Sequence, residues 1–273
     1  MRPLVDVHRL RERLGEPGLI VVDCRFTLGE PGAGRGAWLA GHVPGAAFLD
    51  LDSDLAGEPG ARGRHPLPGR DAFQAAARRA GIGNRSSVVA YDEAGEGGAA
   101  RLWWLLRHFG HEHAAVLDGG LAAWRESGGP LRAGEETTES GDFEASPRAD
   151  DTAGAEEAAA APVLLDARAP ARYRGESEPI DSVAGHIPGA VNLPSSELAP
   201  GGRFLDPAEL RIRLEGAGAG PGRGTVAYCG SGVTACTVVL AAELAGLPTT
   251  RLYPGSWSEW SRAGRPVERS GAD

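Results

Sequence analysis

Short apolar runs alternate along the whole chain with longer segments in which apolar residues recur at helical spacing. The apolar runs have the length and composition of buried strands, and they lie at residues 19–23, 87–91, 163–166 and 225–228. The helical spacing predicts helices at residues 7–14, 99–109, 121–126, 207–214, 233–245 and 256–261. Alternation of unbroken apolar strands with helices predicts an α/β fold with parallel sheets that carry helices on both faces.

The pattern occurs twice. Residues 41–46 read Gly-His-Val-Pro-Gly-Ala, and residues 185–190 read Gly-His-Ile-Pro-Gly-Ala. In each half this motif follows a strand that ends in Asp and precedes a second strand, and a glycine turn with Trp124 or Trp260 closes the half. The copies lie much farther apart than the roughly 20–50 residues of solenoid repeats, so the chain contains two similar domains.

A polar segment separates the two halves. Residues 134–161 contain Phe143 as their only large apolar residue, and the rest is mostly Glu, Thr, Ser, Asp, Ala and Pro. We predict a first domain over residues 1–133, a linker over residues 134–161 whose tail begins a helix, and a second domain over residues 162–273.

Composition excludes several classes of partner. The net charge of −9 argues against binding to nucleic acid, because phosphate backbones require clustered cations. No run of about 18 apolar residues predicts a membrane span, and the N-terminus lacks the apolar core of a signal peptide, so we expect a cytoplasmic protein. The three cysteines form neither a disulfide framework nor a zinc-binding pattern, and we expect no metal and no other cofactor.

One cysteine stands where a strand gives way to a helix. The strand at residues 225–228 is followed by Cys229-Gly-Ser-Gly-Val-Thr234 and then by a helical pattern. A helix N-terminus favours the thiolate, and the glycines allow successive N–H groups to turn toward one point. Ser231 and Thr234 add hydroxyl groups, although Thr234 also suits helix capping. The equivalent position in the first half is Asp92, which predicts one catalytic domain and one without the nucleophile.

Taken together, these motifs resemble those of the two-domain rhodanese-like sulfurtransferases, and the Gly-Ser pair after Cys229 is similar to the 3-mercaptopyruvate branch. The resemblance implies tandem rhodanese-like domains, the first of them inactive. It implies that sulfur passes from 3-mercaptopyruvate to Cys229 as a persulfide and pyruvate is released. The acceptor would be a thiol such as thioredoxin or glutathione, or cyanide.

The resemblance also implies roles for individual residues. Arg172 matches the arginine that binds the donor carboxylate, and Ile180 stands where several relatives have a second arginine. Ser231 and His42 match two members of a proton relay, although His186 at the same place in the other half favours a structural role for His42. Further candidates for contacts with the substrate are Gly230, Gly232, Val233, Thr234, Arg174 and His65.

Three other functions compete with this hypothesis. A thiosulfate:cyanide sulfurtransferase has the same nucleophile, but its compact dianionic donor favours cations in the loop, where this chain has Gly230 and Ser231. A non-catalytic module that only carries a persulfide is the second alternative. A cysteine-based phosphatase needs an arginine six positions after the cysteine, and Ala235 occupies that place.

Overall fold

The computed structural model describes residues 2–270 and divides the chain into two compact units. Unit 1 contains the residues up to Gly57 together with Leu67–Arg148 and Gly201–Phe204. Unit 2 contains Glu58–Pro66, Ala149–Pro200 and the residues from Leu205 onward. Each unit therefore includes one short segment from the opposite half of the sequence.

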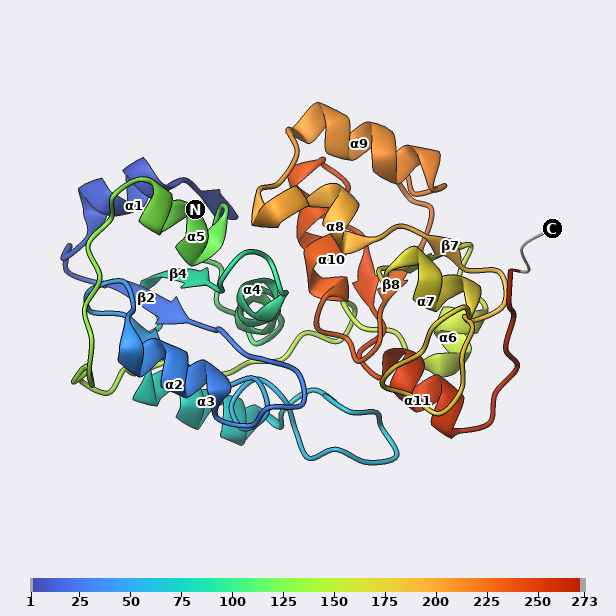
Figure 1. The fold of residues 1–273 in the computed structure, drawn as a ribbon, viewed down its shortest axis with the longest axis horizontal. Coiled ribbons are helices and arrows are strands. Elements are labelled where there is room, and N and C mark those ends of the chain that lie inside the picture. Colours follow the sequence, from blue (N-terminus) through green and yellow to red (C-terminus); the bar gives the residue numbers. More distant parts are fainter. Residues whose placement is uncertain (1, 271–273) are drawn as a thin grey trace. The chain divides into compact units, whose positions relative to one another are not determined.

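Unit 1 is built on five parallel strands in the order β1-β5-β4-β2-β3. The strands are β1 (Leu4–Val5), β2 (Leu19–Asp23), β3 (Ala47–Phe48), β4 (Ser87–Tyr91) and β5 (Ala114–Leu117). The helices are α1 (Val7–Arg13), α2 (Ala33–Ala40), α3 (Arg70–Arg79), α4 (Gly98–His108) and α5 (Gly120–Glu126). Helices α1 and α5 lie on one side of this sheet, and α2 and α3 lie on the other (Figure 1).

Unit 2 is built on four parallel strands in the order β7-β6-β8-β9. The strands are β6 (Val163–Asp166), β7 (Val191–Asn192), β8 (Thr225–Tyr228) and β9 (Arg251–Leu252). The helices are α6 (Ala155–Ala159), α7 (Pro170–Arg174), α8 (Ser195–Leu198), α9 (Pro207–Gly216), α10 (Ala235–Leu244) and α11 (Ser256–Arg262), and the 3-10 turn η1 (Pro200–Gly202) begins in unit 2 and continues into the segment Gly201–Phe204 of unit 1. Helix α10 packs on α8 and α9 as well as on β8.

In each unit, the apolar faces of the helices pack against the sheet and form a hydrophobic core. In unit 1, Leu10 of α1 and Trp124 of α5 pack with Val21 and Val89 of the sheet. In unit 2, the equivalent cluster joins Trp257 and Trp260 of α11 to Leu164, Val226 and Tyr228 of the sheet and to Ala155 and Ala158 of α6. Burial of these large side chains provides most of the driving force for packing helices on the sheets.

The duplication predicted from the sequence is confirmed by the topology, because the order β5-β4-β2-β3 returns as β9-β8-β6-β7. The repeated turn is fixed in the same way in both copies. The N–H of Val43 donates to the hydroxyl of Tyr91 at 3.1 Å, and the N–H of Ile187 donates to the hydroxyl of Tyr228 at 3.2 Å. The repeated motif therefore anchors a turn to the end of a central strand.

All four strands expected from apolar runs are present with the predicted bounds, and all six expected helices are found with ends shifted by two residues or fewer. The helix expected at residues 233–245 is α10 and begins later, because Gly232 adopts a φ of +77° and the turn continues through Thr234. The pattern did not predict α2 and α3. Helix α2 contains Gly34 and Gly36, which have low helix propensity.

The segment between the two halves is ordered. Phe143 is 1% exposed, and the N–H of Asn84 donates to Asp142 Oδ1 at 2.9 Å, so this part of the segment belongs to unit 1. Helix α6 follows and belongs to unit 2. Across residues 2–270, no helix is long and apolar enough to cross a membrane.

Candidate active site

The Cys229 loop, residues 229–234, connects β8 to α10 and holds its cysteine at the carboxyl end of the strand. Cys229 is 1% exposed, and its Sγ accepts a hydrogen bond from the N–H of Gly232 at 3.1 Å. The positive φ of Gly232, +77°, turns this N–H back toward the sulfur. The loop therefore presents a backbone donor to the thiol in the way that anion-binding loops do.

The equivalent loop of unit 1 holds a carboxylate in place of the thiol. Asp92 Oδ1 accepts from the N–H of Gly95 at 2.8 Å, and Oδ2 accepts from Gly97 at 3.0 Å and from Ala99 at 3.2 Å. Burial, together with the nearby charge of Glu96, raises the pKa of Asp92 to about 6. Asp92 and Cys229 both bond to the N–H three residues later, so the duplicated loop binds an acidic group in both units.

Ser231 forms a buried pair with a histidine from the first half of the sequence. Its Oγ and His65 Nδ1 are 2.7 Å apart, and the two residues are 7% and 4% exposed. His65 belongs to the segment Glu58–Pro66 of unit 2. A Cβ at Gly63 would lie 2.7 Å from the carbonyl oxygen of Gly255, so close packing on α11 fixes this segment beside the loop.

Backbone strain marks the other side of Cys229. Ser256, with a φ of +54°, is the only non-glycine residue with positive φ among residues 2–270. Its Oγ accepts from the N–H of Cys229 at 3.1 Å and donates to the carbonyl of Tyr253 at 2.8 Å. Strained residues of this kind persist where the surrounding structure holds them, and they are frequent at functional sites.

Arg168 and Asp166 form a buried ion pair at the end of β6, and side chains of alternating charge follow it toward the Cys229 loop. The guanidinium of Arg168 donates to Asp166 Oδ2 at 2.6 Å, and its Nη1 lies 3.5 Å from Glu178 Oε2. Burial opposes the charge of Arg168, but Asp166 outweighs it and raises the pKa of the guanidinium. Unit 1 repeats the first pair with Arg25 and Asp23, so this pair belongs to the fold.

The series continues toward the Cys229 loop. Arg172 Nη2 donates to Glu178 Oε1 at 2.6 Å and lies 3.5 Å from Asp181 Oδ2, and Arg64 Nη1 donates to Asp181 Oδ1 at 2.8 Å. Burial acts to raise the pKa of Glu178, but the hydrogen bond from Arg172 lowers it overall. These carboxylates hold both guanidinium groups in fixed orientations.

Gly230 lies under both guanidinium groups. A Cβ on Gly230 would lie 3.2 Å from Arg64 Nη2 and 3.4 Å from Arg172 Nη1. The φ of Gly230 lies outside the left-handed region, so its backbone conformation does not require glycine. A side chain is disfavoured there because the two guanidinium groups occupy the space that it would need. Two cations thus face the residue next to Cys229.

The remaining candidates have other surroundings. His42 Nδ1 lies 2.7 Å from the carbonyl oxygen of Trp38 and its Nε2 lies 3.3 Å from Glu136 Oε1, so unit 1 engages both ring nitrogens. His186 repeats the first contact in unit 2. Arg174 forms an exposed pair with Glu176. Val233 is 4% exposed, and Thr234 occupies the N-cap position of α10 without a side-chain bond to the helix.

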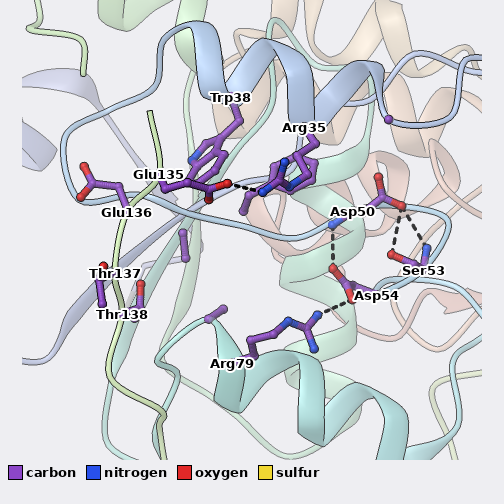
Figure 2. A pocket seen from close by; sticks show the side chains of 14 residues that line it. Arg35, Trp38, Asp50, Ser53, Asp54, Arg79, Glu135, Glu136, Thr137 and Thr138 are labelled. Atoms are coloured by element: carbon purple, nitrogen blue, oxygen red, sulfur yellow. Dashed lines mark hydrogen bonds and ion pairs between the residues drawn. The ribbon is translucent and has the colours of Figure 1, made fainter. Parts of the chain in front are cut away.

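Unit 1 also contains an open cavity of about 670 Å³ (Figure 2). None of the residues that line this cavity belongs to the Cys229 loop. Two ion pairs lie in its lining, Arg35 with Glu135 and Arg79 with Asp54. Its lining contains no cysteine. Across residues 2–270, no group of three or more His, Cys, Asp or Glu side chains is arranged to hold a metal ion.

Both halves of the chain, residues 6–127 and 151–263, match the rhodanese-like domain. The chain belongs to the rhodanese-like family of sulfurtransferases. A probable 3-mercaptopyruvate sulfurtransferase from Pseudomonas aeruginosa is 46% identical over 94% of each chain. A putative thiosulfate sulfurtransferase from Mycobacterium tuberculosis is 45% identical over 94% of this chain and 93% of its own.

A solved structure agrees with the rhodanese fold in both domains. The crystal structure of SseA from Escherichia coli, described as a 3-mercaptopyruvate sulfotransferase, matches with a TM-score of 0.82 and 32% identity. The match covers 95% of this chain and 100% of that chain. The expected fold class, tandem rhodanese-like domains, is therefore confirmed.

Sequence reasoning missed Arg64 and Ser256 as residues of this rhodanese site. Arg64 precedes His65, which the family resemblance already marks, so its position was a usable signal. Ser256 gives no such signal, because its role comes from a backbone conformation that the sequence does not reveal.

Proposed function

We propose that this rhodanese-like protein transfers sulfur from 3-mercaptopyruvate through a persulfide on Cys229 to a thiol or cyanide, with release of pyruvate. The observation that carries the proposal is the juxtaposition around Cys229 of a backbone donor, a hydroxyl–imidazole pair and cations over Gly230. Relatives named as 3-mercaptopyruvate sulfurtransferases are 35–46% identical over at least 94% of this chain, which supports the choice of donor.

In the first step, the thiolate of Cys229 attacks the sulfur of the donor. A sulfur–sulfur bond forms, the carbon–sulfur bond breaks, and its electron pair passes to the enolate of pyruvate. The proton of the donor thiol is transferred to the methylene carbon, which becomes the methyl group of pyruvate. The backbone N–H of Gly232 stabilises the negative sulfur, which is a charge-assisted hydrogen bond.

We assign the proton transfer to Ser231 and His65 in place of the expected pair of Ser231 and His42. The 2.7 Å hydrogen bond between Ser231 Oγ and His65 Nδ1 supports a relay in which the hydroxyl exchanges a proton with the imidazole. His42 keeps a structural role in its turn, as its counterpart His186 does. Arg172 binds the donor carboxylate through the Nη1 that faces Gly230.

In the second step, the outer sulfur of the persulfide passes to the acceptor and the Cys229 thiolate is restored. A thiol acceptor becomes a persulfide, and cyanide becomes thiocyanate, so each step balances without a cofactor. We propose a small thiol or a protein dithiol such as thioredoxin as the acceptor.

Thiosulfate is the second candidate donor, because two guanidinium groups near Cys229 also suit a compact dianion. Steady-state turnover of both donors, with Cys229→Ser as the control, separates the two functions. We expect a higher kcat/KM for 3-mercaptopyruvate and no turnover by the variant. Faster use of thiosulfate would reverse the assignment, and a persulfide that reaches no acceptor would identify a carrier.

A further inference from the structure

Ser256 lies directly beside the nucleophile in a strained backbone conformation, with a φ of +54°, and it is fully buried. We propose that Ser256 is a positioning residue for persulfide formation, whose hydroxyl fixes the backbone of Cys229 so that the sulfur meets the N–H of Gly232. The proposal rests on the proposed function, because it takes Cys229 to be the residue that receives the sulfur.

Ser256 and Trp257 hold both backbone polar groups of Cys229. The Oγ of Ser256 accepts a hydrogen bond from the N–H of Cys229 at 3.1 Å, and the N–H of Trp257 donates to the carbonyl of Cys229 at 3.0 Å. The hydroxyl of Ser256 donates its own proton to the carbonyl of Tyr253 at 2.8 Å, so an oxygen lone pair faces Cys229. These bonds fix the two peptide planes that flank the Cα of Cys229, and therefore the direction of its Cβ and Sγ.

Unit 1 provides an internal comparison, because Gly120 occupies the position equivalent to Ser256. Gly120 has nearly the same φ, +59°, and the N–H of Leu121 donates to the carbonyl of Asp92 at 2.9 Å, which repeats the bond from Trp257. A Cβ on Gly120 would lie 2.6 Å from the carbonyl oxygen of Asp92, so unit 1 leaves no room for a side chain there. The hydroxyl is therefore a feature of the unit that carries the cysteine.

The strain at Ser256 indicates that its hydroxyl contributes something that glycine cannot. Glycine adopts a positive φ readily, whereas a residue with a Cβ does so at a cost in stability. Since unit 1 has glycine in the same turn, the backbone geometry alone does not call for serine. The contact that serine adds is the bond with the N–H of Cys229, and strain of this kind is concentrated at functional sites.

The same turn also contacts the residue that binds the sulfur. A Cβ on Gly232 would lie 2.4 Å from the carbonyl oxygen of Pro254, so Gly232 packs directly on the turn that leads to Ser256. The backbone nitrogen of Gly232 lies 3.1 Å from Cys229 Sγ. The turn therefore holds both the cysteine and its hydrogen-bond donor, and a shift of the Cys229 backbone would weaken the bond between them.

The test compares Ser256→Gly with Ser256→Ala and uses Ser261→Ala as the control. Both variants of Ser256 lose the hydroxyl, but glycine also relieves the strain, so the Tm of Ser256→Gly should be about 2–8 °C above that of Ser256→Ala. Despite this difference, both should form the persulfide about 10- to 100-fold more slowly than the unmodified protein, the range for loss of a hydrogen bond to a charged group. Ser261→Ala removes another buried hydroxyl of α11, which donates to the carbonyl of Trp257, and should react like the unmodified protein.

Two readouts distinguish positioning from folding. The KM for 3-mercaptopyruvate should stay within about threefold in all three variants, because the loss affects the reaction of the bound donor and not its binding. Alkylation of Cys229 by iodoacetamide, located by peptide mapping, should slow in both Ser256 variants, because it uses the same sulfur. Persulfide formation by Ser256→Gly within about twofold of the unmodified protein would overturn the proposal, as would an equal loss in Ser261→Ala. If the unmodified protein releases no pyruvate from 3-mercaptopyruvate, the proposed function itself is wrong, and the alkylation rates still test how Ser256 positions the sulfur.

Discussion

Substitution of Gly232 by alanine tests whether the N–H of this residue stabilises the sulfur of Cys229. The new Cβ would lie 2.4 Å from the carbonyl oxygen of Pro254, so the loop must move. The φ of +77° adds a backbone cost of about 1–2 kcal/mol for an L-residue. Displacement of the N–H removes a hydrogen bond to a thiolate, which contributes about 1.5–3 kcal/mol. We therefore expect persulfide formation to slow about 10- to 100-fold.

The matched control is Gly246→Ala. Gly246 has nearly the same φ, +75°, but a Cβ there would meet nothing within 4 Å. In this variant only the cost of the positive φ destabilises the fold, and each kcal/mol lowers Tm by about 2–4 °C. Its rate of persulfide formation should be that of the unmodified protein. Rapid-quench mass spectrometry of the persulfide and thermal unfolding measure the two effects. If both variants form persulfide at equal rates, the N–H of Gly232 does not stabilise the thiolate.

Three further variants address the neighbours of Cys229 and its counterpart in unit 1. Ser231→Ala should lower kcat for 3-mercaptopyruvate about 100-fold or more, the usual contribution of a positioned proton-transfer group, and a kcat near that of the unmodified protein would exclude the relay. Ser256→Ala leaves the buried N–H of Cys229 without its acceptor, at a cost of about 1–3 kcal/mol in the free energy of unfolding, which denaturant titration measures. The pKa of Asp92 is about 6 in the fold against an ordinary value of 3.8, so its protonation stabilises the fold at low pH and this stabilisation is lost as pH rises through about 6. Relative to Asp92→Asn, the unmodified protein should therefore lose about 2 kcal/mol between pH 4 and pH 7, and a constant difference would contradict the raised pKa.

The sequence was sufficient for those features that depend on local pattern. Apolar runs of four or five residues located the central strands, and the repeated motif located the two domains. The glycines around Ser231 marked the Cys229 loop, because the fold needs a positive φ at Gly232 to turn an N–H toward the sulfur.

The rest of the site depends on tertiary packing. His65 and Ser231 are 166 residues apart, and no periodicity or spacing connects them. The family resemblance made His42 a candidate for the relay, whereas its repetition as His186 favoured a structural role, and both histidines make the same contact between Nδ1 and a backbone carbonyl. Arg64 and Ser256 reach the site through the packing of Gly63 on α11 and through a strained backbone. The sequence signals Arg64 only through its neighbour His65, and it gives no signal for Ser256.

A single-turnover reaction with 3-mercaptopyruvate and no acceptor tests the central claim most directly. Pyruvate release and the mass of the intact protein are measured together, with Cys229→Ser in parallel. We predict one equivalent of pyruvate and one added sulfur atom, located on Cys229 by peptide mapping, and neither product in the variant. Release of pyruvate by Cys229→Ser, or an added sulfur on Cys24 or Cys236 in place of Cys229, would contradict the account.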